Sequence, residues 1–172
     1  MSSFPVALTC LGLVSLMQLL VIVSGGPVEE STTLPAMLVS IETVSDIREY
    51  RKAHADLTIE PLAVRSVVNQ AGGNNRKQIV YTLGARFSGD QLVAISSGGK
   101  SWTSPQDIKL NLQYPTTGVG ASVTYVEVIV DQSSELGQGY VVSGGVGQRF
   151  IQLVIEAYNT VYFNYSAAIY GF

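Results

Sequence analysis

The feature that most constrains this chain is a two-residue alternation of apolar and polar side chains through its carboxy-terminal two thirds. In residues 108–114, isoleucine, leucine and tyrosine alternate with lysine, asparagine and glutamine. Because successive side chains of a β-strand point to opposite faces of a sheet, this period predicts a strand with one buried face. Further strands are predicted at residues 62–68, 79–83, 91–96, 122–131, 140–143, 148–158 and 160–170.

Glycine-rich turn sequences separate these predicted strands. They are Gly72-Gly73-Asn74-Asn75, Ser88-Gly89-Asp90, Gly98-Gly99 and Gly144-Gly145. We predict that Gly89, Gly144, Gly145 and Gly147 are structural turn residues, and that Asp90 caps its turn by accepting hydrogen bonds from nearby backbone amides. About seven or eight short strands, with no helical pattern to supply parallel crossovers, predict an all-β fold. We expect an antiparallel β-sandwich or small barrel.

The amino-terminal segment has the layout of a secretory signal peptide. The first 28 residues carry no charge, residues 4–23 are almost continuously apolar, and small residues follow at Ser24, Gly25 and Gly26. We therefore predict a signal peptide over residues 1–25, whose removal takes away the only cysteine, Cys10. The alternative is an uncleaved membrane anchor, because the apolar run approaches the roughly 20 residues that span a bilayer.

A charged leader separates this segment from the predicted β domain. Residues 27–65 hold seven acidic and four basic side chains and no glycine, whereas residues 66–172 hold 14 glycines and six charges of each sign. We predict a leader over residues 26–60 and a β domain over residues 61–172. Three- and four-residue spacing predicts one leader helix, carrying Ile41, Val44, Ile47, Tyr50 and His54 on one face. That helix either covers the β domain or serves as a propeptide or partner-binding element.

Catalytic and cofactor chemistry finds little support in this composition. The only histidine, His54, lies in the leader, no Gly-x-Ser-x-Gly elbow is present, and the carboxylates match no calcium loop. The glycine loop at residues 143–147 lacks the Lys-Ser or Lys-Thr of a phosphate loop, although its amides with Arg149 are an alternative anion site. We expect no enzyme activity, no cofactor and no metal. The net charge of −3 argues against direct nucleic-acid binding.

Aromatic residues supply the predicted binding surface. Seven of the nine tyrosines fall between Tyr114 and Tyr170. They either fill the core or form an outward patch for a protein partner or a small apolar ligand, with Tyr125, Tyr158, Tyr162 and Tyr170 as its residues. Asn164 begins an Asn-Tyr-Ser sequon and is a predicted glycosylation site if the chain enters the secretory path.

The β domain also resembles a known family, through short motifs in a fixed order over about residues 78–172. The motifs are residues 81–86 (Tyr-Thr-Leu-Gly-Ala-Arg), 88–90 (Ser-Gly-Asp), 126–131 (Val-Glu-Val-Ile-Val-Asp), 142–148 (Val-Ser-Gly-Gly-Val-Gly-Gln) and 170–171 (Tyr-Gly). They resemble the insect multiprotein bridging factor 2 family of transcription-activating factors. The resemblance implies an intracellular co-activator that bridges a DNA-bound nuclear-receptor-type factor to the general transcription machinery. Many relatives nevertheless look like secreted insect proteins of unknown role.

Two functions are therefore open. The predicted signal peptide favours a secreted, extracellular, non-enzymatic binding protein, which meets a membrane only through an uncleaved signal segment. The alternative is a nuclear co-activator that acts through protein contacts. An exposed edge strand would also allow self-association into a homo-oligomer.

Overall fold

The computed structural model describes residues 37–45, 52–53, 60–69 and 76–172. The chain divides into two compact units, Met1–Thr32 and Thr33–Phe172, and every described residue belongs to the second. The predicted signal peptide and much of the predicted leader helix, including Ile47, Tyr50 and His54, lie outside the described residues. Within the described part of the chain, no helix has the length and apolar character needed to cross a bilayer.

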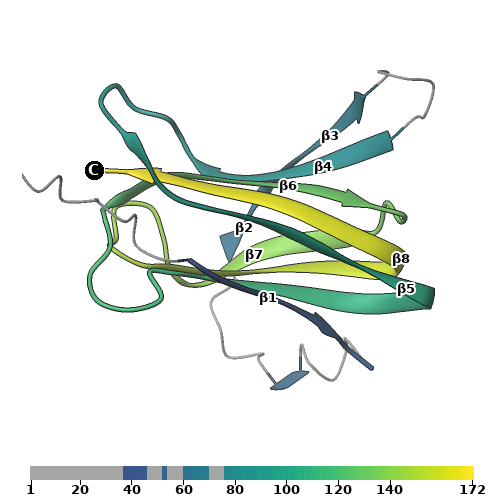
Figure 1. Cartoon of the computed structure of the whole chain (residues 1–172). Helices are drawn as coiled ribbons and strands as arrows, with labels where there is room; N and C mark the ends of the chain where they lie inside the picture. The colour runs from purple at the N-terminus through teal and green to yellow at the C-terminus, as the bar shows by residue number, and fades with distance from the viewer. Residues whose placement is uncertain (1–36, 46–51, 54–59, 70–75) are drawn as a thin grey trace, which may run out of the picture. The chain divides into compact units, whose positions relative to one another are not determined.

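The described residues form eight β-strands joined in one open, antiparallel sheet (Figure 1). The predicted all-β, antiparallel class is thus confirmed. The strands are β1 (Leu38–Thr43), β2 (Glu60–Pro61), β3 (Ala63–Asn69), β4 (Arg76–Gly84), β5 (Gln91–Tyr114), β6 (Val123–Gln132), β7 (Gly137–Gly144) and β8 (Ile151–Gly171).

Two long strands, β5 and β8, give the sheet its two halves. Residues 91–101 of β5 pair with residues 162–171 of β8, and residues 106–114 pair with residues 151–160. One half continues from β8 through β6 and β4 to β3, and the other contains β1, β7 and β2. Figure 1 shows the two halves facing each other. The structure thus differs from a sandwich of two separate sheets or a closed barrel, because the same two strands run through both halves.

The length of β5 corrects one sequence prediction. Gly98 and Gly99, predicted as a turn, lie inside β5 and pair with Tyr165 and Asn164 of β8. A Cβ at Gly98 would approach the Tyr165 ring to 3.1 Å, and one at Gly99 would collide with the Asn164 amide. The two glycines are therefore explained by close approach of cross-strand side chains rather than by a chain reversal.

The core lies between the halves and follows the alternation in the sequence. Ile108, Leu110, Leu112 and Tyr114 are all fully buried. Burial of each such side chain stabilises the fold by about 1.5–3 kcal/mol. The other fully buried apolar side chains include Val123, Val128, Val130, Ile151, Leu153, Ile155, Phe163 and Ile169.

The leader contributes a strand where the sequence predicted the start of a helix. Ile41 lies in β1 and pairs with Leu110 of β5. The Val44 amide continues this edge by donating to the Asp107 carbonyl at 2.9 Å. Pairing with β1 satisfies backbone groups of β5 that a helix would leave open, and this tertiary gain outweighs the local helical spacing.

Candidate functional site

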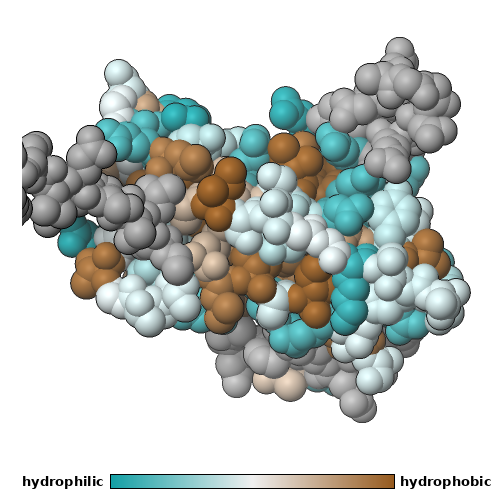
Figure 2. Space-filling model, in the orientation of Figure 1, coloured by the Kyte–Doolittle hydropathy of each residue, from teal (hydrophilic) through white to brown (hydrophobic). Residues whose placement is uncertain are grey.

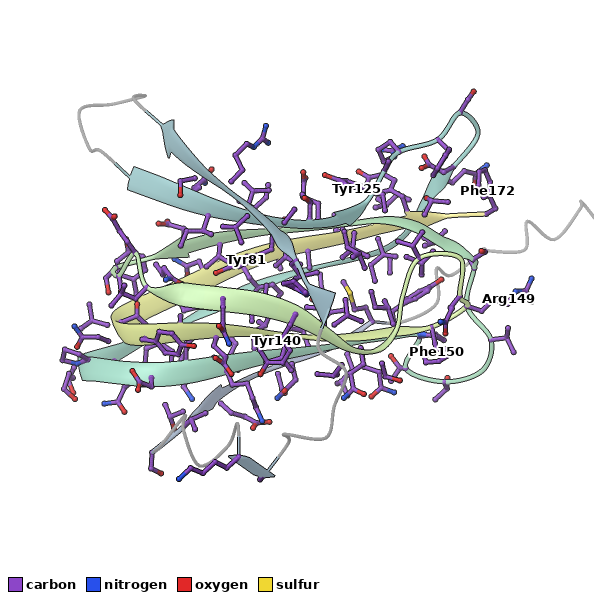
Figure 3. All side chains as sticks on the ribbon, turned by 180° about the vertical axis from the view of Figure 1, so that it is seen from behind. Tyr81, Tyr125, Tyr140, Arg149, Phe150 and Phe172 are labelled. Carbon is purple, nitrogen blue, oxygen red and sulfur yellow. The ribbon has the colours of Figure 1, made fainter. Side chains whose placement is uncertain are left out.

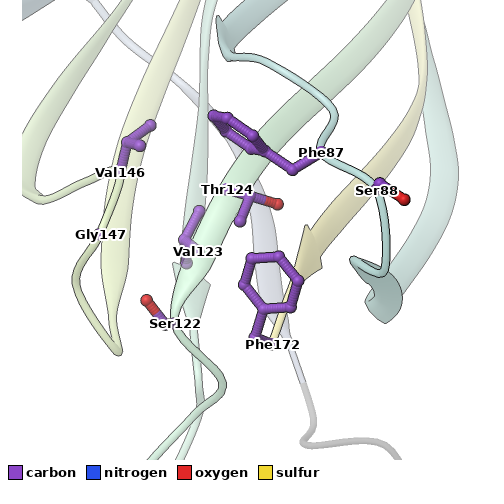
Figure 4. A pocket seen from close by; sticks show the side chains of 8 residues that line it. All are labelled: Phe87, Ser88, Ser122, Val123, Thr124, Val146, Gly147 and Phe172. Carbon is purple, nitrogen blue, oxygen red and sulfur yellow. The ribbon is translucent and has the colours of Figure 1, made fainter.

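A pocket opens at one end of the sheet, where four chain segments meet (Figure 4). Its volume is about 540 Å³. This size falls within the range of about 300–1,000 Å³ found for ligand sites. Figure 4 shows Phe87 and Phe172 on one side and Val146 on the other, with Val123 and Thr124 between them. The lining residues are Phe87, Ser88, Ser122, Val123, Thr124, Val146, Gly147 and Phe172.

Exposed apolar side chains concentrate around this pocket. We call the loops at residues 84–90, 115–122 and 145–150, together with residues 170–172, the pocket end. Figure 3 shows Phe150 and Phe172 there, and Figure 2 shows apolar groups on the surface among hydrophilic ones. Of nine exposed large hydrophobic side chains in the described residues, five belong to the pocket end: Phe87, Val119, Val146, Phe150 and Phe172. Clustered exposure of this kind marks interaction sites in soluble domains.

The glycine loop after β7 forms one wall of the pocket. The Gly147 amide donates to the Val123 carbonyl at 2.7 Å, and the Val123 amide donates to the Gln148 carbonyl at 2.8 Å. Gly144, Gly145 and Gly147, like Gly89 in the opposite loop, all have positive φ angles. At Gly144 a Cβ would also collide with the Phe150 carbonyl, so this position requires glycine.

Asp90 organises the opposite wall. Its Oδ1 accepts from Arg86 Nε at 2.8 Å, and its Oδ2 accepts from the Phe87 amide at 2.9 Å and from Thr124 Oγ1 at 3.0 Å. The Arg86 side-chain hydrogen bond is the main cause that lowers the Asp90 pKa to about 2. The structure therefore places this predicted turn cap within a network that fixes the loop carrying Phe87.

Arg86 also links the loop to the aromatic residues of the sheet. Its guanidinium carbon lies 3.6 Å from the centroid of the Tyr170 ring, and the Tyr170 ring lies 6.1 Å from that of Tyr125. The hydrogen bond to Asp90 raises the Arg86 pKa above its usual value. Burial, followed by hydrogen bonding to Glu127, raises the Tyr125 pKa.

The four tyrosines predicted as one binding patch do not gather in one place. Tyr125 and Tyr170 lie together beside Arg86, whereas the Tyr162 hydroxyl lies 3.4 Å from the Asp131 carboxylate further along the sheet. Tyr158 belongs to the other half of the sheet, where its hydroxyl donates to Glu156.

Sequence reasoning missed the environment of Glu156. This carboxylate is fully buried, accepts from the Tyr140 hydroxyl at 2.7 Å and from Gln138 Nε2 at 3.1 Å, and also accepts from Tyr158. The alternation placed Glu156 on the polar face of its strand, and the available signal was only the nearby tyrosines. We assign the cluster a structural role, because the hydrogen bonds compensate for burying a charge.

Asn164, the predicted glycosylation residue, is exposed on β8. It pairs with Gly99 of β5 and Asp131 of β6, so it lies in the middle of a regular sheet. Its glycosylation stays a prediction. Among the residues that the structure describes, no three His, Cys, Asp or Glu side chains come close enough together to hold a metal ion.

Comparison with protein families identifies the chain's relatives. A model of the family described as transcription activator MBF2 matches residues 83–171. The chain belongs to the MBF2 family. The resemblance inferred over about residues 78–172 is thereby confirmed. The MBF2 match begins at the end of β4, includes β5 to β8 and contains every pocket-lining residue except Phe172. The comparisons with curated proteins and with solved structures found no match.

Proposed function

We propose that this protein is a transcriptional co-activator that works through protein contacts, bridging a DNA-bound nuclear-receptor-type factor and the general transcription machinery. The observation that carries the proposal is the MBF2 family match over residues 83–171, because the family is described as transcription activators. This reading reverses the preference for a secreted binder that the amino-terminal sequence favours.

The pocket end supports action by protein contact. It combines an apolar pocket with exposed phenylalanines, which are the side chains that fill partner pockets and carry binding energy in protein interfaces. A co-activator of this kind needs neither catalysis nor a cofactor. The equal numbers of acidic and basic side chains over residues 66–172 also argue against strong phosphate binding, which depends on an excess of Lys and Arg.

A tethering assay tests the proposal. A heterologous DNA-binding domain is fused to the amino terminus of the full chain, and transcription of a reporter with matching sites is measured. We expect several-fold activation over the DNA-binding domain alone. Phe87→Ser should reduce it, whereas Ile95→Ser, which removes an exposed apolar side chain outside the pocket, should not. A fusion protein present in nuclei but inactive would contradict the proposal.

A second candidate function rests on the uncharged opening of the chain. The first 28 residues without a charge favour export, and a secreted member would use the same pocket to bind a partner outside the cell. Amino-terminal sequencing of protein from the medium, set beside immunostaining of nuclei, separates the two. A mature start near Gly26 in the medium would select the secreted function.

A further inference from the structure

We propose that the pocket end binds a partner segment in which an aromatic or long aliphatic side chain is flanked by carboxylates. The inference rests on the proposed function, since it names the chemistry of the partner at the same site. It combines two independent observations, one on the shape and polarity of the pocket and one on the charges around it.

The pocket selects for an apolar side chain. Its exposed apolar walls are the Phe87 and Phe172 rings and the Val146 side chain, and its volume is about 540 Å³. Phe87 and Phe172 are 56% and 60% exposed, so a side chain seated against them in the pocket would remove considerable apolar surface from water. An aromatic or long aliphatic group gains most from such a site, because the hydrophobic effect scales with the buried area.

The charges around the pocket select for acidic neighbours. The pocket end carries three charged side chains, Arg86, Asp90 and Arg149. The Asp90 side chain has no exposed surface, while that of Arg86 is 48% exposed and Arg149 is exposed. Solvent at this end therefore meets two positive side chains, although the whole chain has a net charge of −3.

Arg86 is paired with Asp90, but its side chain is 48% exposed and still reaches solvent. The guanidinium is held between the Asp90 carboxylate, 2.7 Å from Nη2, and the Tyr170 ring. Arg149 follows the loop that forms the Val146 wall, and Figure 3 shows it beside Phe150 at the same end as Phe172. The loops that carry the Phe87 and Val146 walls thus each hold one arginine, which a segment lying across the pocket could meet. Its carboxylates would be steered toward these arginines and would help to fix its register.

A nucleic acid fits these observations less well. A single strand needs a continuous cationic groove with aromatic platforms, and each phosphate contact needs its own Lys or Arg. Here the loops that carry Phe87 and Val146 each contribute one arginine, Arg86 and Arg149, which does not make a continuous track. The acidic-apolar segment is therefore the occupant that matches both observations.

Fluorescence anisotropy with three labelled peptides tests the proposal on the full chain. The first peptide places Phe and Leu between Asp and Glu residues, the second keeps Phe and Leu but replaces the acids by Lys, and the third keeps the acids but replaces Phe and Leu by Ala. We expect saturable binding of the first peptide alone, weakened by added salt because exposed charges are screened. Phe87→Ser should weaken it about fivefold or more. Arg149→Glu should weaken this binding and make it less sensitive to salt than binding by the wild type.

Matched variants and competing ligands complete the design. Ile95→Ser and Lys100→Glu alter an exposed apolar and an exposed cationic side chain of β5 outside the pocket, so they should leave binding unchanged. Val146→Ser should repeat the effect of Phe87→Ser from the other wall, and thermal melts establish that each variant is folded. Equal binding of the lysine or alanine peptide would overturn the proposal. Tighter binding of a single-stranded oligonucleotide would also overturn it. So would sedimentation experiments that show a dimer of the chain to which the peptide no longer binds.

The outcomes separate this inference from the proposed function. Binding of the acidic-apolar peptide with a silent tethered reporter would support the partner chemistry and refute the co-activator. An active reporter without peptide binding would refute the partner chemistry and support the co-activator.

Discussion

The carboxylate of Asp90 lies 2.7 Å from Nη2 of Arg86, four residues earlier, and has no exposed surface of its own. The same carboxylate holds the Phe87 amide and the Thr124 hydroxyl. One buried side chain thus ties the loop before β5 to the start of β6, and these two segments form much of the pocket. The geometry of the pocket end depends on this contact.

Asp90→Asn should lower the stability of the domain at pH 7 and make that stability depend less on pH in acid, because the variant lacks the titrating carboxyl. Arg86 and the other donors lower the Asp90 pKa to about 2 from its usual value of 3.8. Because the folded-state pKa is depressed, the stabilising contribution is present above about pH 4 and is lost as the pH falls toward 2. Urea unfolding at pH 7, 4 and 2.5 measures the effect. Glu135→Gln, in an exposed loop, serves as the control, and an unchanged pH dependence in Asp90→Asn would contradict the prediction.

Tyr140→Phe should destabilise the domain by about 1.5–3 kcal/mol, because it removes a hydrogen bond to a buried carboxylate. The bond to Glu156 is 2.7 Å long and fully buried. Tyr125→Phe offers a matched comparison, since its hydroxyl donates to Glu127 at a partly buried site. We expect a smaller loss there, and equal losses in chemical denaturation would argue against the special role of Glu156.

Tyr81→Phe should leave stability unchanged or raise it by about 1 kcal/mol, because an unsatisfied buried hydroxyl carries a desolvation cost. Tyr81 is 1% exposed, and its hydroxyl has no hydrogen-bond partner among the described residues. Burial raises its pKa to about 12. As the pH rises above 10, the unfolded chain releases a proton that the folded chain retains, so stability falls between pH 10 and 12. In the variant, the free energy of unfolding should depend less on pH between pH 10 and 12. A clear loss of stability at pH 7 would refute the prediction.

Gly144→Ala should destabilise the domain more than Gly118→Ala. Both glycines have φ near +70°, a conformation that costs other residues about 1–2 kcal/mol. At Gly144 the new Cβ would also collide with the backbone of Phe150, whereas at Gly118 it would meet open space. The difference between the two melting temperatures isolates the collision. Similar losses at the two sites would show that the loop after β7 can shift.

The sequence predicted the strands well and their connections less well. Alternation in residues 108–114 and 122–131 fixed which side chains face the core, because that property depends only on the two-residue period. It could not show that residues 91–114 form one strand, since the Gly98-Gly99 pair has the local signature of a turn and its true reason lies on β8. Ile41 was likewise predicted to lie in a helix, because its strand partner, Leu110, is distant in the sequence and local spacing could not reveal it.

The candidate site was predictable only in parts. Asp90 and the turn glycines were identified from local turn chemistry, which acts within a few residues. The pocket combines Phe87, Val123, Val146 and Phe172, which the strand register alone brings together. The tyrosine patch was divided because Tyr158 and Tyr162 lie on either side of the irregular register in β8, so they fall in different halves of the sheet.

The most direct test of the account is to map the surface that a partner covers. In heteronuclear NMR spectra of the full chain, addition of the acidic-apolar peptide should shift the amide signals of residues 84–90, 119–124, 145–150 and 170–172. Signals of β1 and β3, which lie at the two edges of the sheet, should not move. Shifts confined to those edge strands, or no shifts at saturating peptide, would contradict the claim that the pocket end is where this protein binds its partner.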